Sequence, residues 1–311
     1  MELAPSVTEE ARRKRLTPKR NAATTKDNVN FLLSKIIKSS SQALKLIFIL
    51  LLLGAALAPF WWLFVTSCRA DGVYGSGWNV LWPQIWTGEY YQRLLGAQDQ
   101  LPMLRFFFNT LVYCAFGVIL EVSLSALAAY PLARLQFKGK GLVVFILMAT
   151  LALPSQANII INFATIRSLG LYDTMAGVIL PGAVSVFAIL LCRQAFLSIP
   201  QELEDAARLD GCNEWEIFRH VCLPLTLPTQ ATVALFAFTA NWNAFLWPLV
   251  VLKSDSHYPL SVGLAYLSSS FDSDFRVVAA GSVAATLPLI LLFLAIQKHF
   301  IKGITAGAVK S

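Results

Sequence analysis

Charge is scarce in this sequence of 311 residues, of which only 14% are Asp, Glu, Lys or Arg. A soluble domain carries roughly 25% charged residues. Apolar residues make up 56% of the chain, the mean hydropathy is +0.61, and the apolar residues come in long blocks. This composition excludes an ordinary water-soluble core and indicates an integral membrane protein.

The residue patterns of catalysis and metal binding are also missing. No CxxC, HExxH or GxSxG pattern occurs, and no GxxxxGK[ST] phosphate-binding loop is present. We therefore predict no catalytic residue, no metal and no cofactor, and we expect the chain not to be an enzyme. The residues that such sites would use are few and scattered: His220, His257, His299, Cys68, Cys114, Cys192, Cys212 and Cys222.

Positive charge is concentrated at the start of the chain. The net charge is +7, and ten of the 25 Lys and Arg residues precede Leu46. No stretch interleaves basic and aromatic residues as nucleic-acid-binding surfaces do, so no nucleic-acid partner is expected. Residues 1–40 are predicted to form a basic, disordered cytosolic tail.

Long apolar segments follow the tail, and each reaches the roughly 20 residues that cross a bilayer. The predicted fold is an all-α integral membrane protein with six transmembrane helices. Residues 41–311 form the membrane domain, with a cytosolic loop at 197–226 between the fourth and fifth helices. The spans are expected at about 45–67, 106–132, 141–164, 174–196, 227–252 and 278–299.

The distribution of Lys and Arg predicts the orientation. With the N-terminus inside, nineteen of these residues fall in inside segments and six in outside segments. Because cytosolic loops are enriched in Lys and Arg, both termini are predicted to be cytosolic.

The loop between the fourth and fifth spans is the most charged part of the apolar region. Its sequence "ELEDAARLDG" (202–211) predicts a short helix, with Ser198 as its cap and Gly211 ending it in a left-handed turn. Asn213, with Glu216 three residues on, predicts a second short helix. Leu203, Ala206, Ala207 and Asp210 then share one face, and the acids are expected to lie on the solvated side. From the residues alone, this face is either a contact for another protein or a solvated connector.

The same stretch resembles the EAA signature of ABC importer permeases. Asp205, Ala206 and Ala207 stand at the Glu-Ala-Ala positions, Gly211 at the glycine, and Leu223-Pro224 closes the pattern. Asp205 replaces the family's Glu, which keeps the charge and shortens the side chain. Further motifs appear in the family's order over residues 45–311: "FFFNTLVYC" with Asn109, "AAYPLARLQFKGK", "NWNAFLWPLVVL" and "FIKGITAGAVKS". Together they resemble the carbohydrate-importing, maltose-type subfamily and its six-span partner.

This resemblance implies partners and a mechanism. In the family, the EAA loop is a coupling helix that docks into a cleft of a cytosolic ATPase. The implied partners are two cytosolic ABC ATPase subunits, a second homologous permease, an extracytoplasmic substrate-binding protein, a sugar-like substrate and membrane lipid. The implied location is the bacterial or archaeal cytoplasmic (inner) membrane, crossed several times. The implied ATPase contacts are Asp205, Ala206, Ala207, Asp210 and Gly211, with Lys302, Gly303 and Thr305 of the C-terminal tail.

Polar residues within the spans are candidates for the substrate pathway. Glu121 is the one acid inside a predicted span, and it either lines the pathway or bonds to a neighbouring helix. Amides and aromatic rings suit sugar hydroxyls and C–H faces, although amides also join helices in membranes. The candidates are Glu121, Asn158, Asn241, Trp242 and Asn243, with Gln156 and Asn162 nearby.

Two other functions compete with that of an importer permease. An intramembrane enzyme would need a paired nucleophile and base, or a metal set, within the spans. An ion-coupled secondary transporter would be expected to carry several charged residues in its spans and no ATPase-docking loop. The importer permease is the better match, and the secondary transporter is the alternative.

Overall fold

The computed structural model describes residues 42, 44–70, 72, 77–95, 103–269 and 274–308, without the side chains of 155, 156, 269 and 295–308. The basic tail predicted at 1–40 lies outside the described residues. The chain divides into two compact units, Met1–Trp62 and Leu63–Ser311. The described part of the first unit belongs to an apolar helix, Leu44–Ser67. The other described helices all belong to the second unit.

The described residues form helices and no strands, with one isolated β-bridge between Arg69 and Trp86. Helices satisfy their own backbone hydrogen bonds, which a bilayer interior requires. In chain order they are η1 (Gly77–Val80), α2 (Glu89–Leu95), α3 (Met103–Ala133), α4 (Lys140–Thr150), η2 (Ser155–Asn158), α5 (Ile159–Ser168), α6 (Met175–Ile179), η3 (Leu180–Gly182), α7 (Val186–Leu197), α8 (Gln201–Leu209), α9 (Glu214–Ile217), the π-helical turn η4 (Phe218–Cys222), α10 (Leu223–Leu225), α11 (Leu227–Trp242), α12 (Leu246–Val251), η5 (Asp255–His257), α13 (Leu260–Ser269) and α14 (Phe275–Ala308).

Three described helices are long and apolar enough to cross a membrane: Leu44–Ser67, Met103–Ala133 and Phe275–Leu294. Two bent pairs raise the number to five if each pair is one span. Met175–Gly182 and Val186–Leu197 meet at a bend of 46°, and Glu214–Leu225 and Leu227–Trp242 at one of 78°. The all-helical prediction is therefore confirmed for the described residues, with three to five candidate spans.

The third predicted span, at about 141–164, is not one continuous helix. It consists of α4 and α5, with the 3-10 turn η2 between them. Pro154 directly precedes η2. Proline has no backbone N–H and clashes with a preceding helical turn, which explains why the helix stops there.

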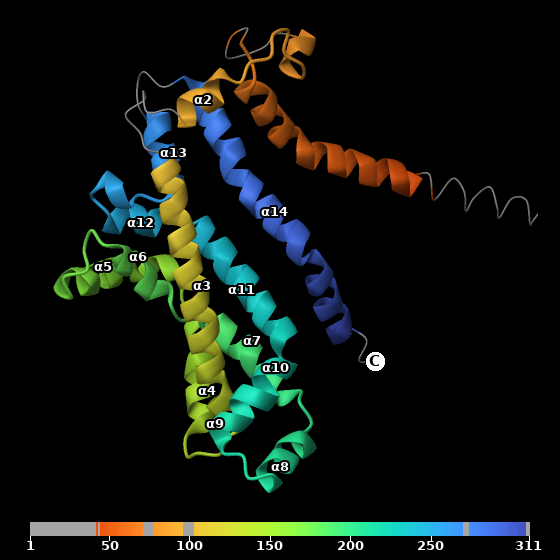
Figure 1. Cartoon of the computed structure of the whole chain (residues 1–311), viewed down its shortest axis with the longest axis vertical. Helices are drawn as coiled ribbons and strands as arrows, with labels where there is room; N and C mark the ends of the chain where they lie inside the picture. The colour runs from red at the N-terminus through yellow and green to blue at the C-terminus, as the bar shows by residue number, and fades with distance from the viewer. Residues whose placement is uncertain are drawn as a thin grey trace, which may run out of the picture. The chain divides into compact units, whose positions relative to one another are not determined.

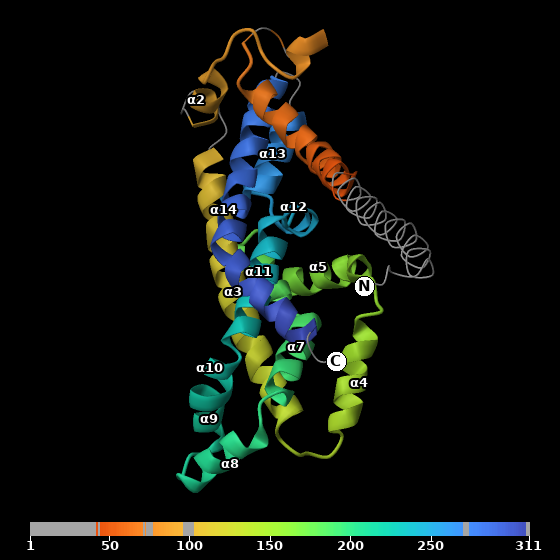
Figure 2. The same ribbon diagram turned by 90° about the vertical axis from the view of Figure 1, so that its right-hand side faces the viewer.

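α3 is the central helix of the second unit, and it packs most extensively on α7 and α11. Figures 1 and 2 show α8 and α9 at one end of α3, here called the α8 end, and α2 and α13 at the other, here called the α13 end. Small residues let membrane helices approach closely. Dispersion and hydrogen bonds then hold the helices together, because lipid provides no hydrophobic driving force for helix association. The buried face of α3 has such residues at Gly117, Ser125, Ala126, Ala129 and Ala133.

Candidate functional site

The α8 segment has the helix–turn–helix form that its sequence predicts. α8 ends at Leu209, and Gly211 adopts a left-handed conformation with φ +86°. The Cys212 N–H then donates to the Ala207 carbonyl at 3.0 Å, which closes the end of the helix. α9 begins with the predicted capping box, in which the Asn213 side chain accepts from the Glu216 N–H and the Glu216 carboxylate accepts from the Asn213 N–H.

The predicted cap at the start of this helix is wrong. Ser198 is the C-terminal cap residue of α7, and its hydroxyl donates to the Ala195 carbonyl at 2.7 Å. Pro200 occupies the N-cap position of α8 and makes no side-chain cap. The reason is that α7 remains helical through Leu197, so Ser198 is still bonded to the last turn of that helix.

The predicted partner face of α8 is split by the fold. Ala207 is only 9% exposed and belongs to the apolar core beside α3 and α7, while Leu209 is 89% and Leu203 45% exposed. Ala206 and Asp210 are exposed as well. The prediction that the acids lie on the solvated side is wrong for Glu204, which is 1% exposed.

Burial of Glu204 is explained by an ion pair with the end of α3. Arg134 Nε lies 2.6 Å from Glu204 Oε1, and the two side chains are 10% and 2% exposed. The Arg134 guanidinium also donates to the Ile199 carbonyl, just before α8. A buried charge is stable only when it is paired and hydrogen-bonded, and the Cys222 thiol adds a contact to Glu204 Oε1 at 3.6 Å. α8 is thus attached to α3 by charge as well as by apolar packing.

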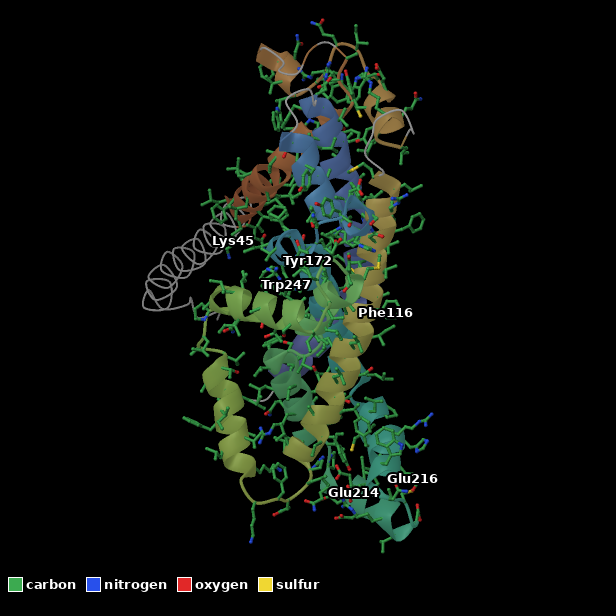
Figure 3. All side chains as sticks on the ribbon, turned by 90° about the vertical axis from the view of Figure 1, so that its left-hand side faces the viewer. Lys45, Phe116, Tyr172, Glu214, Glu216 and Trp247 are labelled. Carbon is green, nitrogen blue, oxygen red and sulfur yellow. The ribbon has the colours of Figure 1, made fainter. Side chains whose placement is uncertain are left out.

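A second connection joins α3 to α9. The Tyr130 hydroxyl donates to Glu214 Oε2 at 2.7 Å, and Arg208 Nε donates to Glu214 Oε1 at 3.0 Å. Figure 3 shows Glu214 and Glu216 at the α8 end. We call the pairs Arg134–Glu204 and Tyr130–Glu214 the carboxylate clasp.

At the α13 end, α3 holds the chain that connects α12 to α13. The Asn109 amide donates to the carbonyls of Ser256 and Tyr258 at 2.9 and 3.0 Å. The Thr110 hydroxyl accepts from the Leu260 N–H at 2.8 Å. The Asn109 motif singled out in the sequence therefore binds the backbone of a distant segment.

Asp173 holds the same connection from the other side. It is the one described non-glycine residue with a positive φ, 59°. Its carboxylate accepts the N–H groups of Lys253 and Ser254 at 2.9 Å each and the Ser254 hydroxyl at 2.5 Å. The Ser254 hydroxyl first, and then the two backbone donors, lower the pKa of Asp173 to about 2.

Asp173→Asn is therefore expected to destabilise the protein by about 1–3 kcal/mol at neutral pH, because the charged acceptor is lost. A depressed pKa stabilises the fold above the ordinary value of 3.8, and the stabilisation disappears as the pH falls toward 2. The difference in detergent unfolding temperature between wild type and variant should thus shrink from pH 6 to pH 3. Asp255→Asn, an exposed acid in the same connection, is the control and should change little.

Between the two ends of α3 lies a cavity of about 470 Å³. α3, α5, α11 and α12 each contribute polar or aromatic groups to its wall. The apolar part includes Val178 and several prolines, among them Pro181, Pro248 and Pro259. The polar and aromatic lining residues are Tyr113, Glu121, Asn162, Asn241 and Trp247.

The position of Asn241 depends on a glycine of α3. A Cβ on Gly117 would lie 2.6 Å from Asn241 Nδ2 and 2.7 Å from Oδ1, so the amide rests directly on the glycine backbone. Asn241 Nδ2 donates to its own helix at the Ala237 carbonyl, at 2.8 Å. Glu121 is 8% exposed. Trp247 is oriented by a 3.2 Å bond from its indole N–H to the Gly177 carbonyl, and Figure 3 shows it between the two ends.

The other predicted pathway residues do not line this cavity. Trp242 is 5% exposed, its indole N–H donates to the Ala285 carbonyl at 3.1 Å, and its ring stacks on Phe238. Asn243 is exposed and bonds to the Thr239 carbonyl, and Asn158 is exposed at the start of α5. Sequence reasoning missed Tyr113 and Trp247, which sit in apolar runs with no local signal of function.

Comparison with known proteins identifies the family. The profile described as "Binding-protein-dependent transport system inner membrane component" matches residues 121–306, more than half of the chain. This chain belongs to that family. The match contains α8, all four residues of the carboxylate clasp and most of the cavity wall.

Individual relatives agree with the family assignment. The probable ABC transporter permease protein YurM of Bacillus subtilis (strain 168) is 33% identical over 85% of this chain and 87% of its own length. The arabinooligosaccharides transport system permease protein AraQ of the same organism is 37% identical over 66% and 73%. A crystal structure of a bacterial ABC transporter involved in the import of the acidic polysaccharide alginate matches with a TM-score of 0.75 and 29% identity, over 83% of this chain and 95% of that one. The resemblance to ABC importer permeases is confirmed, and the relatives are named as transport components rather than enzymes.

Proposed function

We propose that this permease forms half of the translocation pathway of an ABC importer for a sugar or oligosaccharide. The observation that carries the proposal is the cavity beside Gly117, where amides of Asn162 and Asn241 face the same space as two aromatic side chains and one acid. Amides match sugar hydroxyls, and aromatic rings match sugar C–H faces. The names of the AraQ relative and of the alginate transporter support this substrate class.

The proposed topology has six spans and cytosolic termini. It counts Leu44–Ser67, α3, the bent pairs of α6–α7 and α9–α11, and α14 as five spans, with the interrupted α4–α5 segment as the sixth. The α8 end is the cytosolic end. The bias of Lys and Arg supports this choice, since Arg134, Lys138, Lys140, Arg193, Arg208 and Arg219 all belong to the segments predicted inside.

In this orientation α8 is the coupling helix. The proposed contacts with an ATPase cleft are the exposed residues Leu203, Ala206, Leu209 and Asp210, while Asp205 is held by Arg208 at 2.8 Å. Ala207 and Gly211 shape the helix and its end. α14 continues as a helix through Lys302, Gly303 and Thr305, which remain proposed ATPase contacts of the C-terminal segment.

The complete importer is proposed to contain two ATPase subunits, a second permease and an extracytoplasmic substrate-binding protein, in the cytoplasmic membrane of a bacterium or archaeon. The family description names a binding-protein-dependent system, which supports the last partner. The carboxylate clasp supports the coupling role, because it links α8 directly to α3, the helix that carries Glu121 and Gly117.

Gly117→Ala tests the cavity directly. The new methyl group must displace the end of the Asn241 side chain, which can move without unfolding the helices. Losing one amide–hydroxyl bond worth about 0.5–1.5 kcal/mol is expected to raise the KM for uptake roughly two- to twelvefold. The measurement is uptake of a radiolabelled oligosaccharide mixture by proteoliposomes that contain the whole importer. Asn241→Ala should act in the same direction.

Gly141→Ala is the matched control, since a Cβ there has no atom within 4 Å. Unchanged uptake in both Gly117→Ala and Asn241→Ala would show that the cavity is not part of the translocation pathway. The same vesicles distinguish the alternative, a secondary transporter that uses the buried Glu121 for ion coupling. The importer requires ATP, whereas uptake driven by an ion gradient without ATP would favour the alternative.

A further inference from the structure

A second, mostly apolar groove lies along α3 between the cavity residues, which end at Glu121, and the clasp residues, which begin at Tyr130. It has a volume of about 290 Å³ and runs between α3 and the α9–η4–α10 segment. This volume lies at the lower end of the range of small-ligand pockets, and the mostly apolar walls suit a chain-like apolar group. Its apolar lining residues are Val122, Ala126, Leu127, Phe218 and Leu223.

The rim of the groove carries an exposed cation and an exposed tryptophan. Arg219 and Trp215 both line it, one helical turn apart, and Trp215 is 57% exposed. Within the described part of the chain Arg219 has no ion-pair partner. The neighbouring acids are already bonded: Glu214 to Tyr130 and Arg208, and Glu216 to the Asn213 N–H.

The proposed orientation puts the groove at the depth where lipid headgroups meet acyl chains. Leu127 precedes the end of α3 at Ala133 by about 9 Å along the helix axis. Beyond Ala133 come Arg134, Lys138 and Lys140, which bound the membrane on this side under the proposed orientation. Tryptophan and arginine side chains favour this interfacial layer, and arginine binds phosphate with two parallel hydrogen bonds.

The shape of the groove depends on the π-helical turn. η4 (Phe218–Cys222) interrupts the regular helix that α9 begins and α10 continues. Such turns are rare and occur often at functional sites. Here the turn carries Phe218 into the core, at 6% exposure, while the next residue, Arg219, remains at the surface.

We propose that this groove binds one anionic phospholipid of the cytosolic leaflet, with an acyl chain along Leu127 and Phe218 and the phosphate on Arg219. Charge complementarity selects the occupant, since the rim supplies the guanidinium of Arg219, which forms an ion pair with none of the described acids, and the walls supply apolar surface. The inference rests on the proposed orientation but does not depend on which solute the importer carries.

Native mass spectrometry of the purified importer tests the site, with dioleoyl phosphatidylglycerol and dioleoyl phosphatidylcholine as probes. The wild-type complex is expected to retain one more phosphatidylglycerol than the variants Arg219→Gln and Leu127→Trp. Arg219→Gln should weaken retention about fivefold, and Leu127→Trp should fill the groove. Lys138→Gln, an exposed cation of the same membrane side, is the control and should retain the lipid.

Three outcomes would overturn the proposal. Equal retention in wild type and both variants would show that the groove is empty, and equal retention of phosphatidylcholine would show that charge plays no part. Release of the second permease subunit by Leu127→Trp, with lipid retention unchanged, would make the groove an interface between permeases. None of these results bears on ATP-driven uptake, so failure here leaves the proposed function standing.

Discussion

Glu204→Ala is expected to abolish coupled uptake and to reduce the stability of the permease by about 3–5 kcal/mol. The substitution leaves Arg134 buried at 10% exposure without its carboxylate partner, and an unpaired buried charge is costly. It also releases α8 from α3, so movement of a docked ATPase would no longer reach the helix that carries the cavity. Uptake, ATP hydrolysis and detergent unfolding of the reconstituted importer are the measurements.

Two further variants distinguish loss of the attachment of α8 to α3 from loss of stability alone. Glu202→Ala removes an exposed acid from the same turn of α8 and is the matched control, with little effect expected. The double variant Arg134→Met/Glu204→Leu replaces the ion pair by apolar groups, which is often neutral in stability. If attachment is what matters, the double variant should recover both stability and coupling. Equal behaviour of Glu204→Ala and Glu202→Ala would refute a role for the clasp.

Ala206→Trp is expected to prevent binding of the ATPase subunits while the permease stays folded. Ala206 is exposed on α8, so an indole there alters only the surface offered to the cleft. Forcing a bulky side chain into a close-packed contact costs about 1–3 kcal/mol, roughly a five- to 160-fold loss of affinity. Leu209→Ala should weaken binding for the same reason, since 89% of Leu209 is exposed and available to a partner. Co-purification of the ATPase with tagged permease measures both effects.

Ala207→Trp provides the contrast. Ala207 belongs to the same buried apolar cluster as Ile217 and Phe218, so an indole there should disrupt the core and lower the unfolding temperature before any effect on docking is seen. If Ala206→Trp co-purifies with the ATPase as well as wild type does, α8 does not present this face to it. If Ala207→Trp folds normally and loses only docking, the inward placement of Ala207 is irrelevant to its role.

Local features of the α8 segment were predictable because their causes are local. The left-handed Gly211 and the capping box of Asn213 and Glu216 depend on bonds within a few residues. The burial of Glu204 could not be predicted in this way. Its partner, Arg134, is 70 positions away, and nothing in a solvated-looking acidic helix distinguishes Glu204 from the exposed Glu202.

The membrane spans likewise divide into those that the sequence predicts and one that only the structure reveals as interrupted. Long apolar runs predicted α3 and the apolar part of α14, because length and hydropathy alone decide whether a helix crosses a bilayer. The break between α4 and α5 occurs at Pro154, which lies inside the span predicted at about 141–164. Proline is tolerated where neighbouring helices accept the freed backbone groups, which a linear sequence does not reveal.

By itself the sequence determined that this is a helical membrane protein of the importer permease family, with a capped, glycine-ended helix in its most charged loop. Composition, hydropathy and short motifs suffice for these properties because each depends on neighbouring residues. Only the tertiary structure decided that Asn241 and Glu121 line one cavity while Trp242 joins the core, and that Glu204 pairs with Arg134. Those arrangements depend on which helix faces which, and small residues such as Gly117, together with long-range polar bonds, set that packing only when the chain is folded.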